Sequence, residues 1–451
     1  MTRRPISALL VAGLACVATA TVLAWGTPPA VETPVAAAVS TATATHGQGA
    51  SVAPSPTVEP AGPPATVTPA PTPRASEPGS LRDGLAAALQ VRLDGIRKKY
   101  AIPGLSVTII LADGTTWTGV SGHAVVKGKV KVEPDTAFAI ASISKTYTAA
   151  LVLALADEGA LDLDARVTTF LPKVKIAGKA TVRQLLDHTS GLPDFFLNGK
   201  IDRALYADRG RTWTTADTFR YVGKPIFPAG KGWYYSNTNY YLLGMIAEAV
   251  DGRPLAEQVR VRFLDPLGLD HTHTQVAESP RGTLAHGYRV SGTAAKPKYS
   301  DLTDGSEVVP FTSVVTAAGG AGSLAASSID VARWARALYG GEVLSEATVA
   351  AMVADGKLTA RFKPRIPYGL GVQLVKLDGR PALGHSGRLT GFRSVVRHLP
   401  AEGITIAVLT NQSKQDPAII AKALVRIVSP PKPAPTTTPA SSPIPSTSPA
   451  P

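Results

Sequence analysis

A serine and a lysine three residues apart could form a nucleophile and its base. They lie in Ser142-Ile143-Ser144-Lys145, which opens an apolar helical stretch running to about Glu158. Residues three apart share one face of a helix, so the amine can reach the serine oxygen. Burial would lower the lysine pKa and let the amine accept the serine proton, and the helix N-terminus suits an acyl-transfer oxyanion. We predict Ser142 as nucleophile and Lys145 as base; a helix cap beside a surface lysine is the alternative.

Two further motifs occur once each downstream of this pair. In Tyr235-Ser236-Asn237, a phenolate near cations could act as a general base, and the asparagine amide could bind a substrate carbonyl. An aromatic loop with a helix-capping asparagine is the alternative. Gly384-His385-Ser386-Gly387 sits between two strand candidates, where glycine lets a substrate backbone lie close to a strand edge. The backbone N–H of Arg388 could add an oxyanion donor, although a turn histidine without a catalytic role would look the same.

Hydrophobic periodicity predicts an antiparallel α/β fold that carries these motifs. An amphipathic helix over residues 85–100 precedes a hairpin, 105–109 and 115–120, that turns at Asp113-Gly114. We expect the two ends of the chain to share one antiparallel sheet flanked by helices, with a mostly helical domain inserted between them. The late strands are predicted at 368–376, 392–399 and 404–410, the closing helix at 417–428, and the intervening helices at 147–158, 181–187, 239–250, 327–338 and 345–353.

Proline divides the chain of 451 residues into a foldable middle and two arms. Of 38 prolines, 12 fall in residues 27–80 and 9 in residues 430–451. Arms of this composition cannot bury enough apolar surface to fold, so we predict that both are disordered and that the folded domain spans 81–429. That middle holds 42 basic and 30 acidic residues, which suits acidic cell-wall polymers or nucleic acid as surroundings, or a solvated basic surface with no partner.

Residues 1–26 have the organisation of an export signal. Arg3 and Arg4 precede an apolar run over residues 6–24 that is short for a membrane span. We expect a secreted or cell-envelope protein, exported by the general or the twin-arginine route, and therefore no nucleic acid partner. The single cysteine, Cys16, lies inside the signal, so the exported domain would depend on no disulfide.

Several other enzyme classes lack their motifs in this chain. Neither a Gly-x-Ser-x-Gly elbow nor a Walker loop occurs. His271, His273 and His286 could hold a metal, but an exposed polar loop is the simpler explanation, so we predict no metal site and no cofactor. His188 should brace a loop near the site rather than join a catalytic triad.

In their order and spacing, the three motifs resemble those of the serine β-lactamase and penicillin-binding DD-peptidase superfamily, over roughly residues 81–428. The likeness is closest to the class C branch and its secreted D-alanyl-D-alanine carboxypeptidases, which have histidine in the third motif. Supporting matches are Asp187-His188-Thr189-Ser190-Gly191-Leu192, Pro228-Ala229-Gly230, Tyr240-Tyr241-Leu242-Leu243-Gly244 and Ala318-Gly319-Gly320.

That resemblance implies a role for each site residue. Ser142 would be the nucleophile, with Lys145 and Tyr235 sharing the proton transfers and His385 completing the catalytic set. Asn237 would hold the substrate amide, and the backbone N–H groups of Ser142 and Arg388 would form the oxyanion hole. The remaining substrate contacts would come from Ser386, Gly387 and Arg388.

One position departs from the pattern of the carboxypeptidases. They need a positive group for the substrate's terminal carboxylate, and the resemblance places a basic residue soon after Tyr368-Gly369-Leu370-Gly371-Val372. Gln373 stands there instead. Arg388, Arg393 or Lys376 could substitute for it.

The expected function is that of an exported, monomeric serine hydrolase. It would form an acyl-enzyme and act as a D-alanyl-D-alanine carboxypeptidase on peptidoglycan stem peptides, with β-lactams as covalent ligands. The alternatives are an esterase, a D-amino-acid amidase or a β-lactamase acting on small acyl substrates with the same scaffold, and a non-catalytic wall-binding module. The choice depends on the shape of the substrate pocket.

Overall fold

A nine-stranded antiparallel sheet organises the computed structural model, which describes residues 81–430 except 304, 307, 355 and 360–364. The predicted signal peptide, the N-terminal arm and the tail beyond Pro430 lie outside these residues. The strands run in the order β3 (Val130–Lys131), β2 (Thr116–Val125), β1 (Gly104–Ile110), β14 (Ile404–Thr410), β13 (Phe392–Leu399), β12 (Arg380–Leu389), β11 (Gln373–Leu377), β10 (Pro367–Tyr368), β9 (Lys357–Leu358).

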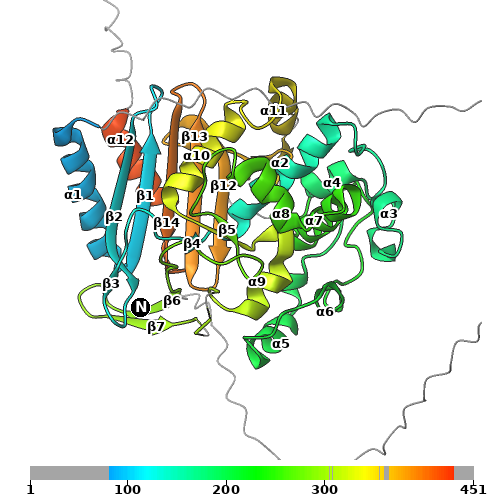
Figure 1. Ribbon diagram of the computed structural model, residues 1–451, viewed down its shortest axis with the longest axis horizontal. Helices are drawn as coiled ribbons and strands as arrows, with labels where there is room; N and C mark the ends of the chain where they lie inside the picture. Colours follow the sequence, from blue (N-terminus) through cyan, green and yellow to red (C-terminus); the bar gives the residue numbers. More distant parts are fainter. Residues whose placement is uncertain (1–80, 304, 307, 355, 360–364, 431–451) are drawn as a thin grey trace, which may run out of the picture. The chain divides into compact units, whose positions relative to one another are not determined.

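The two ends of the described chain meet in this sheet, as predicted. Strand β1 pairs with β14 in an antiparallel register that sets Leu105 opposite Thr410. Helices α1 (Asp83–Tyr100) and α12 (Ala418–Val428) lie side by side on one face of the sheet (Figure 1). Their apolar stripes are buried against the strands because leucine and isoleucine recur at helical spacing in both.

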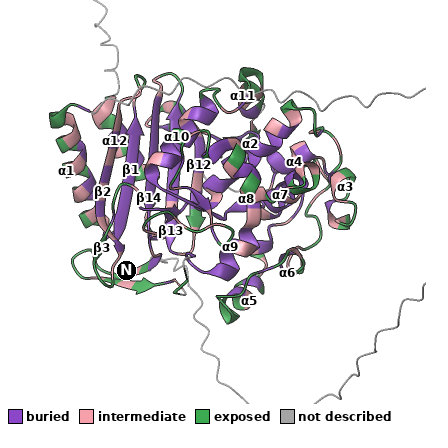
Figure 2. Ribbon diagram, in the orientation of Figure 1, coloured by how far each residue is buried: buried purple, intermediate pink, exposed green. Residues whose placement is uncertain are grey.

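The opposite face of the sheet is covered by α10 (Ser328–Tyr339) and, beyond it, by the inserted helical region. Helix α2 (Ser144–Asp157) has apolar residues on all sides after its first turns and runs through that region, where most of its residues are buried (Figure 2). Helix α7 (Asn237–Asp251) packs against it. The insertion also holds α3 (Val167–Phe170), α4 (Val182–Leu186), α5 (Ile201–Ala207), α6 (Thr215–Phe219), α8 (Leu255–Val259), α9 (Thr312–Ala318) and α11 (Glu346–Val353).

Two small sheets in the insertion were not predicted. Strands β4 (Phe138–Ala139), β8 (Leu324–Ala326) and β5 (His273–Thr274) form one, and β6 (Tyr288–Gly292) pairs with β7 (Pro297–Asp301) in the other. Both are built from short strands whose alternation is too brief to stand out in the sequence.

The prediction of one strand over 368–376 was wrong. The segment turns sharply after Tyr368, and the N–H of Gly369 donates to the carbonyl of Val372, so two short strands form instead of one. Gly371 has a φ of 83°, and a Cβ atom there would overlap Ala149 of α2. The Gly384–Gly387 motif, expected between two strands, lies inside β12.

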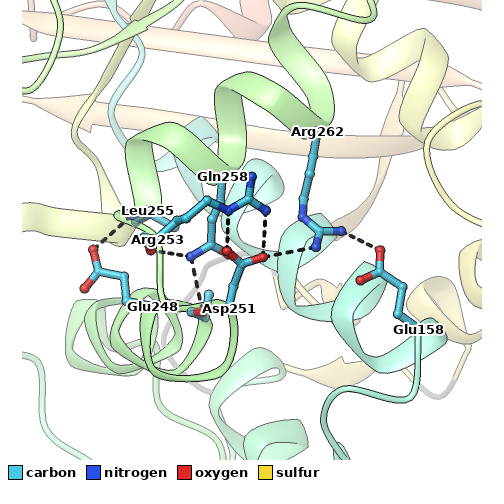
Figure 3. Close-up of polar contacts among 8 residues, drawn as sticks. Glu158, Glu248, Asp251, Arg253, Leu255, Gln258 and Arg262 are labelled. Carbon is cyan, nitrogen blue, oxygen red and sulfur yellow. Dashed lines mark hydrogen bonds and ion pairs between the residues drawn. The ribbon is translucent and has the colours of Figure 1, made fainter. Parts of the chain in front are cut away.

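An ion-pair network connects the C-terminal ends of α2 and α7 (Figure 3). The Asp251 carboxylate, at the end of α7, accepts hydrogen bonds from Arg253 at 2.6 and 2.8 Å and from Arg262 at 3.2 Å. Arg262 also pairs with Glu158, which caps the end of α2. The network therefore fixes the relative position of the two helices whose opposite ends carry Lys145 and Asn237.

Candidate active site

Ser142 lies in a tight turn at the start of the central helix. The turn is a 3₁₀ segment, Ala141–Ile143, that leads directly into α2, and Ala141 has an unfavourable φ of 51° for a residue with a side chain. Lys145 follows in the first turn of α2 with no exposed surface. The turn thereby presents a partly exposed serine while the lysine beside it stays out of water.

The Lys145 ammonium has three acceptors at hydrogen-bonding distance. Its Nζ donates to Ser142 Oγ at 3.1 Å, to Asn237 Oδ1 at 2.8 Å and to the carbonyl of Ala321 at 2.7 Å. Ala321 ends the 3₁₀ segment Gly319–Ala321, which follows α9 and belongs to the Ala318-Gly319-Gly320 motif. The structure thus brings together the serine, the lysine and the asparagine from motifs 92 residues apart.

Burial makes Lys145 a suitable base. It lowers the pKa of the ammonium to about 7, although the nearby Asp194 carboxylate partly opposes the shift. Near neutral pH a large share of the lysine is therefore the free amine, whose lone pair can accept the proton of Ser142 Oγ.

Tyr235 is hydrogen-bonded to Ser142, but its environment favours the phenol over the phenolate. Burial raises the pKa of Tyr235 above its usual value, and the hydrogen bond with Ser142 only partly offsets this. The Lys145 ammonium lies 5.1 Å from the centre of the tyrosine ring. A protonated Tyr235 can donate a proton beside the serine. The geometry therefore suits Lys145 as the general base that accepts the Ser142 proton and Tyr235 as the general acid.

Asp194 is a site residue that the sequence analysis missed. Its carboxylate accepts a hydrogen bond from Asn237 Nδ2 at 2.9 Å, and Asn237 in turn accepts from Lys145. Burial raises the pKa of Asp194, and the Lys145 charge opposes that rise. Asp194 follows the quoted Asp187–Leu192 motif by two residues, and this proximity was the available signal.

The third motif lies on an open edge of β12. Strand β11 pairs with β12 only as far as Gln373 opposite Gly384, whereas β13 pairs with it up to Leu389. From His385 onward, no strand in the described part of the chain pairs with the other edge. Ser386, Gly387 and Arg388 lie on this free stretch, which can pair with an extended substrate backbone.

Gly387 permits the free stretch of β12 to approach the nucleophile. A Cβ atom there would overlap both the carbonyl oxygen of Ile140 and the hydroxyl of Ser394. That hydroxyl donates to the Ile140 carbonyl at 2.9 Å, which ties β13 to the turn before Ser142. Ser142 and Arg388 line the same pockets, where their backbone N–H groups are predicted to form the oxyanion hole.

His385 is buried and neutral. Its Nδ1 lies 2.7 Å from the carbonyl oxygen of Ser386, an acceptor only, so Nδ1 carries the proton and Nε2 accepts from the Tyr368 hydroxyl at 3.0 Å. Burial lowers its pKa to about 3, and the Lys145 charge adds to the effect. His385 lines the same pocket as Ser142 and Tyr235, with both ring nitrogens held by protein groups.

His188 braces the loop that carries Tyr235, as predicted. Its Nδ1 accepts from the backbone N–H of Ser236 at 3.2 Å and contacts the Asn239 amide at 3.0 Å. The centre of the His188 ring lies 4.4 Å from that of the Tyr235 ring and 4.9 Å from that of the Tyr368 ring. The sequence had not indicated that Tyr368 belongs to the site. The described residues contain no group of three or more side chains able to hold a metal ion.

Ser142 lies between two pockets of similar size. One, of about 280 Å³, is lined by apolar side chains, by the Asp194 and Asp202 carboxylates and by Arg388. The other, of about 290 Å³, is lined by Tyr235, by the three arginines Arg388, Arg393 and Arg397, and by one carboxylate, Asp416. Arg388 lines both pockets. We call the first the acidic pocket, because carboxylates outnumber arginines in it, and the second the basic pocket, because arginines outnumber carboxylates there.

Known proteins resemble this chain over the described domain. The Beta-lactamase family model matches residues 86–428. Penicillin-binding protein 4 of Amycolatopsis lactamdurans is 32% identical over 339 residues, covering 71% of this chain and 84% of that protein. A D-aminopeptidase of Gluconobacter oxydans (strain 621H) is 26% identical over 343 residues, covering 73% and 60%.

Solved structures give the same assignment. A D-stereospecific amidohydrolase from Streptomyces sp. superposes with a TM-score of 0.62 at 28% identity, covering 75% of this chain and 97% of that one. The predicted fold class and the family resemblance are therefore confirmed. The chain belongs to the Beta-lactamase family and is a serine hydrolase of the β-lactamase and penicillin-binding protein superfamily.

Proposed function

We propose that the protein is an exported D-alanyl-D-alanine carboxypeptidase that acts on peptidoglycan stem peptides through an acyl-enzyme on Ser142. The observation that carries the catalytic part is the buried Lys145 amine, 3.1 Å from the Ser142 hydroxyl with a pKa near 7. The similarity to a penicillin-binding protein and to a D-stereospecific amidohydrolase supports a D-amino-acid substrate.

Acylation would proceed in two proton-linked steps. The Lys145 amine removes the Ser142 proton as Oγ attacks the substrate carbonyl, and the oxyanion is held by the backbone N–H groups of Ser142 and Arg388. The intermediate collapses as the leaving amine takes a proton from Tyr235, and the proton on Lys145 restores the phenol. Water then attacks the acyl-enzyme by the reverse set of transfers, which releases the acid and regenerates Ser142.

The test is a substrate panel combined with mass spectrometry of the intact protein. We expect an acyl-D-alanyl-D-alanine peptide to be hydrolysed, its L,L counterpart to be inert, and penicillin to add one covalent equivalent to Ser142. Ser142→Ala is the matched control. Turnover of a neutral nitrophenyl ester or a chromogenic cephalosporin without turnover of the peptide would favour the esterase or β-lactamase alternative.

A D-aminopeptidase or D-amino-acid amidase is the second candidate, and the acidic pocket favours it. The carboxylates of Asp194 and Asp202 outnumber the single arginine of this pocket, Arg388, and lie with apolar side chains such as Phe196 and Val314, a combination suited to an ammonium group beside an apolar side chain. Under this alternative, D-phenylalanine amide would be cleaved faster than its N-acetylated form. The carboxypeptidase requires the opposite order, because its acyl group is the blocked end of a peptide.

Export is supported by the arginine pair and the apolar run of residues 1–26. None of the helices among the described residues is both long and apolar enough to span a membrane. We expect the mature protein in the culture medium or the cell envelope, with a new N-terminus near residue 27. An intact N-terminus in the cytoplasmic fraction would contradict export.

A further inference from the structure

Arg397, on β13, is a buried cation that forms no ion pair among the described residues, although the Asp416 carboxylate, which lines the same pocket, acts on its charge from farther away. Its side chain is 7% exposed, and none of the ion pairs found among the described residues includes it. Its guanidinium donates instead to two neutral oxygens, the Val396 carbonyl at 2.8 Å and Gln373 Oε1 at 2.9 Å. Burial lowers its pKa only to about 10, so it stays charged at neutral pH. A buried charge is costly unless an opposite charge compensates it.

Glycine at position 384 lets this arginine extend across the sheet. Arg397, Gly384 and Gln373 are opposite one another on β13, β12 and β11. A Cβ atom on Gly384 would lie 3.2 Å from Arg397 Nη1 and would overlap the Val396 carbonyl. Without a side chain on the middle strand, the guanidinium crosses β12 and reaches Gln373.

Gln373 connects the arginine to the substrate pocket. While its Oε1 accepts from Arg397, its Nε2 donates to the Ser386 hydroxyl at 3.1 Å. Ser386 Oγ is thus an acceptor in that bond, and its own proton is available to another acceptor. All three residues line the basic pocket beside Ser142.

The basic pocket lies on the leaving-group side of the nucleophile. The leaving group must receive a proton, and Tyr235, the donor in the proposed mechanism, lines this pocket but not the acidic one. A group held by Ser386 would therefore belong to the part of the substrate that departs.

We propose that Arg397, acting through Gln373 and Ser386, makes this pocket select leaving groups that carry a carboxylate. The Ser386 hydroxyl donates to the carboxylate, and Arg397 supplies the positive charge that the residue at position 373 lacks. Arg397 is a positioning residue here, because it acts through its hydrogen bond to Gln373 and the bond from Gln373 to Ser386. The inference rests on the proposed function and identifies the residue that supplies the positive charge for the carboxylate of its leaving group.

Two matched thioesters test the inference. An N-acyl-D-alanyl thioester of mercaptoacetate is compared with that of mercaptoacetamide, which differs only in the leaving-group charge. We expect the wild-type kcat/KM to favour the carboxylate by roughly 10- to 100-fold, the scale of a charge-assisted hydrogen bond. Arg397→Gln should reduce the ratio to below about threefold, and Arg397→Lys should retain part of it.

Two further variants keep the test decisive. Gln373→Glu has the same shape as the wild-type residue and would neutralise the charge of Arg397 in place. It should therefore also remove the preference for the carboxylate thioester, even if Arg397→Gln does not fold. Arg393→Gln is the control, since Arg393 lines the same pocket but is only half-buried. The proposal would be overturned if Arg393→Gln or Arg388→Gln lost the preference for the carboxylate thioester while Arg397→Gln retained it.

The assay separates this inference from the proposed function. If wild-type protein cleaves both thioesters at equal kcat/KM, the leaving-group inference is wrong and the acyl-enzyme mechanism stands. If neither thioester acylates Ser142, the proposed function fails and this inference fails with it.

Discussion

The pH dependence of acylation tests the central argument about Lys145. If the neutral amine is the base, the acylation rate constant should follow the fraction of Lys145 that is unprotonated. With a pKa of about 7, that fraction is roughly 0.03 at pH 5.5 and roughly 0.97 at pH 8.5. The rate constant should therefore rise about 30-fold across this range and then level off.

A lysine with an ordinary pKa would behave differently. Its neutral fraction would rise about tenfold per pH unit over the whole range, without a plateau below pH 9. The assay is stopped-flow acylation by a fluorescent penicillin, whose reactive groups do not titrate between pH 5 and 9. A rate constant that climbs without levelling, or one that is independent of pH, would refute the assignment of Lys145 as a buried base.

Asp194 supplies a second test of the same argument. Its charge holds the Lys145 pKa above the value that burial alone would produce, so Asp194→Asn should move the midpoint to lower pH. The asparagine oxygen can still accept the hydrogen bond from Asn237. Asp202→Asn is the matched control, because Asp202 lines the same pocket but is exposed and should shift the midpoint less.

Other predictions concern the nucleophile, the strand contact, the helix anchor and the domain limits. Ser142→Ala should abolish penicillin labelling with an unchanged circular dichroism spectrum; persistent labelling would identify another nucleophile. Gly387→Ala should slow acylation and lower Tm, because the added methyl group would displace β12 from Ile140. Wild-type kinetics in this variant would show that the close contact is not needed for acylation. Asp251→Asn should destabilise the fold by about 2 to 3 kcal/mol in urea titrations at pH 7. The hydrogen bonds from Arg253 lower the pKa of Asp251 to about 2, so the contribution of Asp251 to the free energy of unfolding should be lost as pH falls from about 4 toward 2. The wild type should show this loss of stability, and the variant should not. A chain trimmed to residues 81–429 should hydrolyse soluble substrates at the full rate, and failure to fold would show that an arm is needed.

Much of the architecture could be predicted because local patterns dominate it. The opening helix, the first strand of the hairpin, β13, β14 and the closing helix agree with their predicted ranges within two residues, whereas β2 continues to Val125, beyond its predicted end at residue 120. Each has a long run of buried side chains at a single period, and such a run has few alternative structures. The segment at 368–376, strand β12 and the two small sheets were exceptions. In the first of these, the turn depends on how closely Gly371 approaches α2.

The sequence by itself determined which side chains could do chemistry: Ser142 and Lys145 are one helical turn apart wherever that helix lies. Only the tertiary structure decided their surroundings. Asn237 and Ala321 reach Lys145 from 92 and 176 residues away, and Arg397 reaches Gln373 across a strand that carries glycine. The protonation states follow from those contacts, because desolvation and neighbouring charges set a pKa, and both are properties of the packed molecule rather than of the residue type.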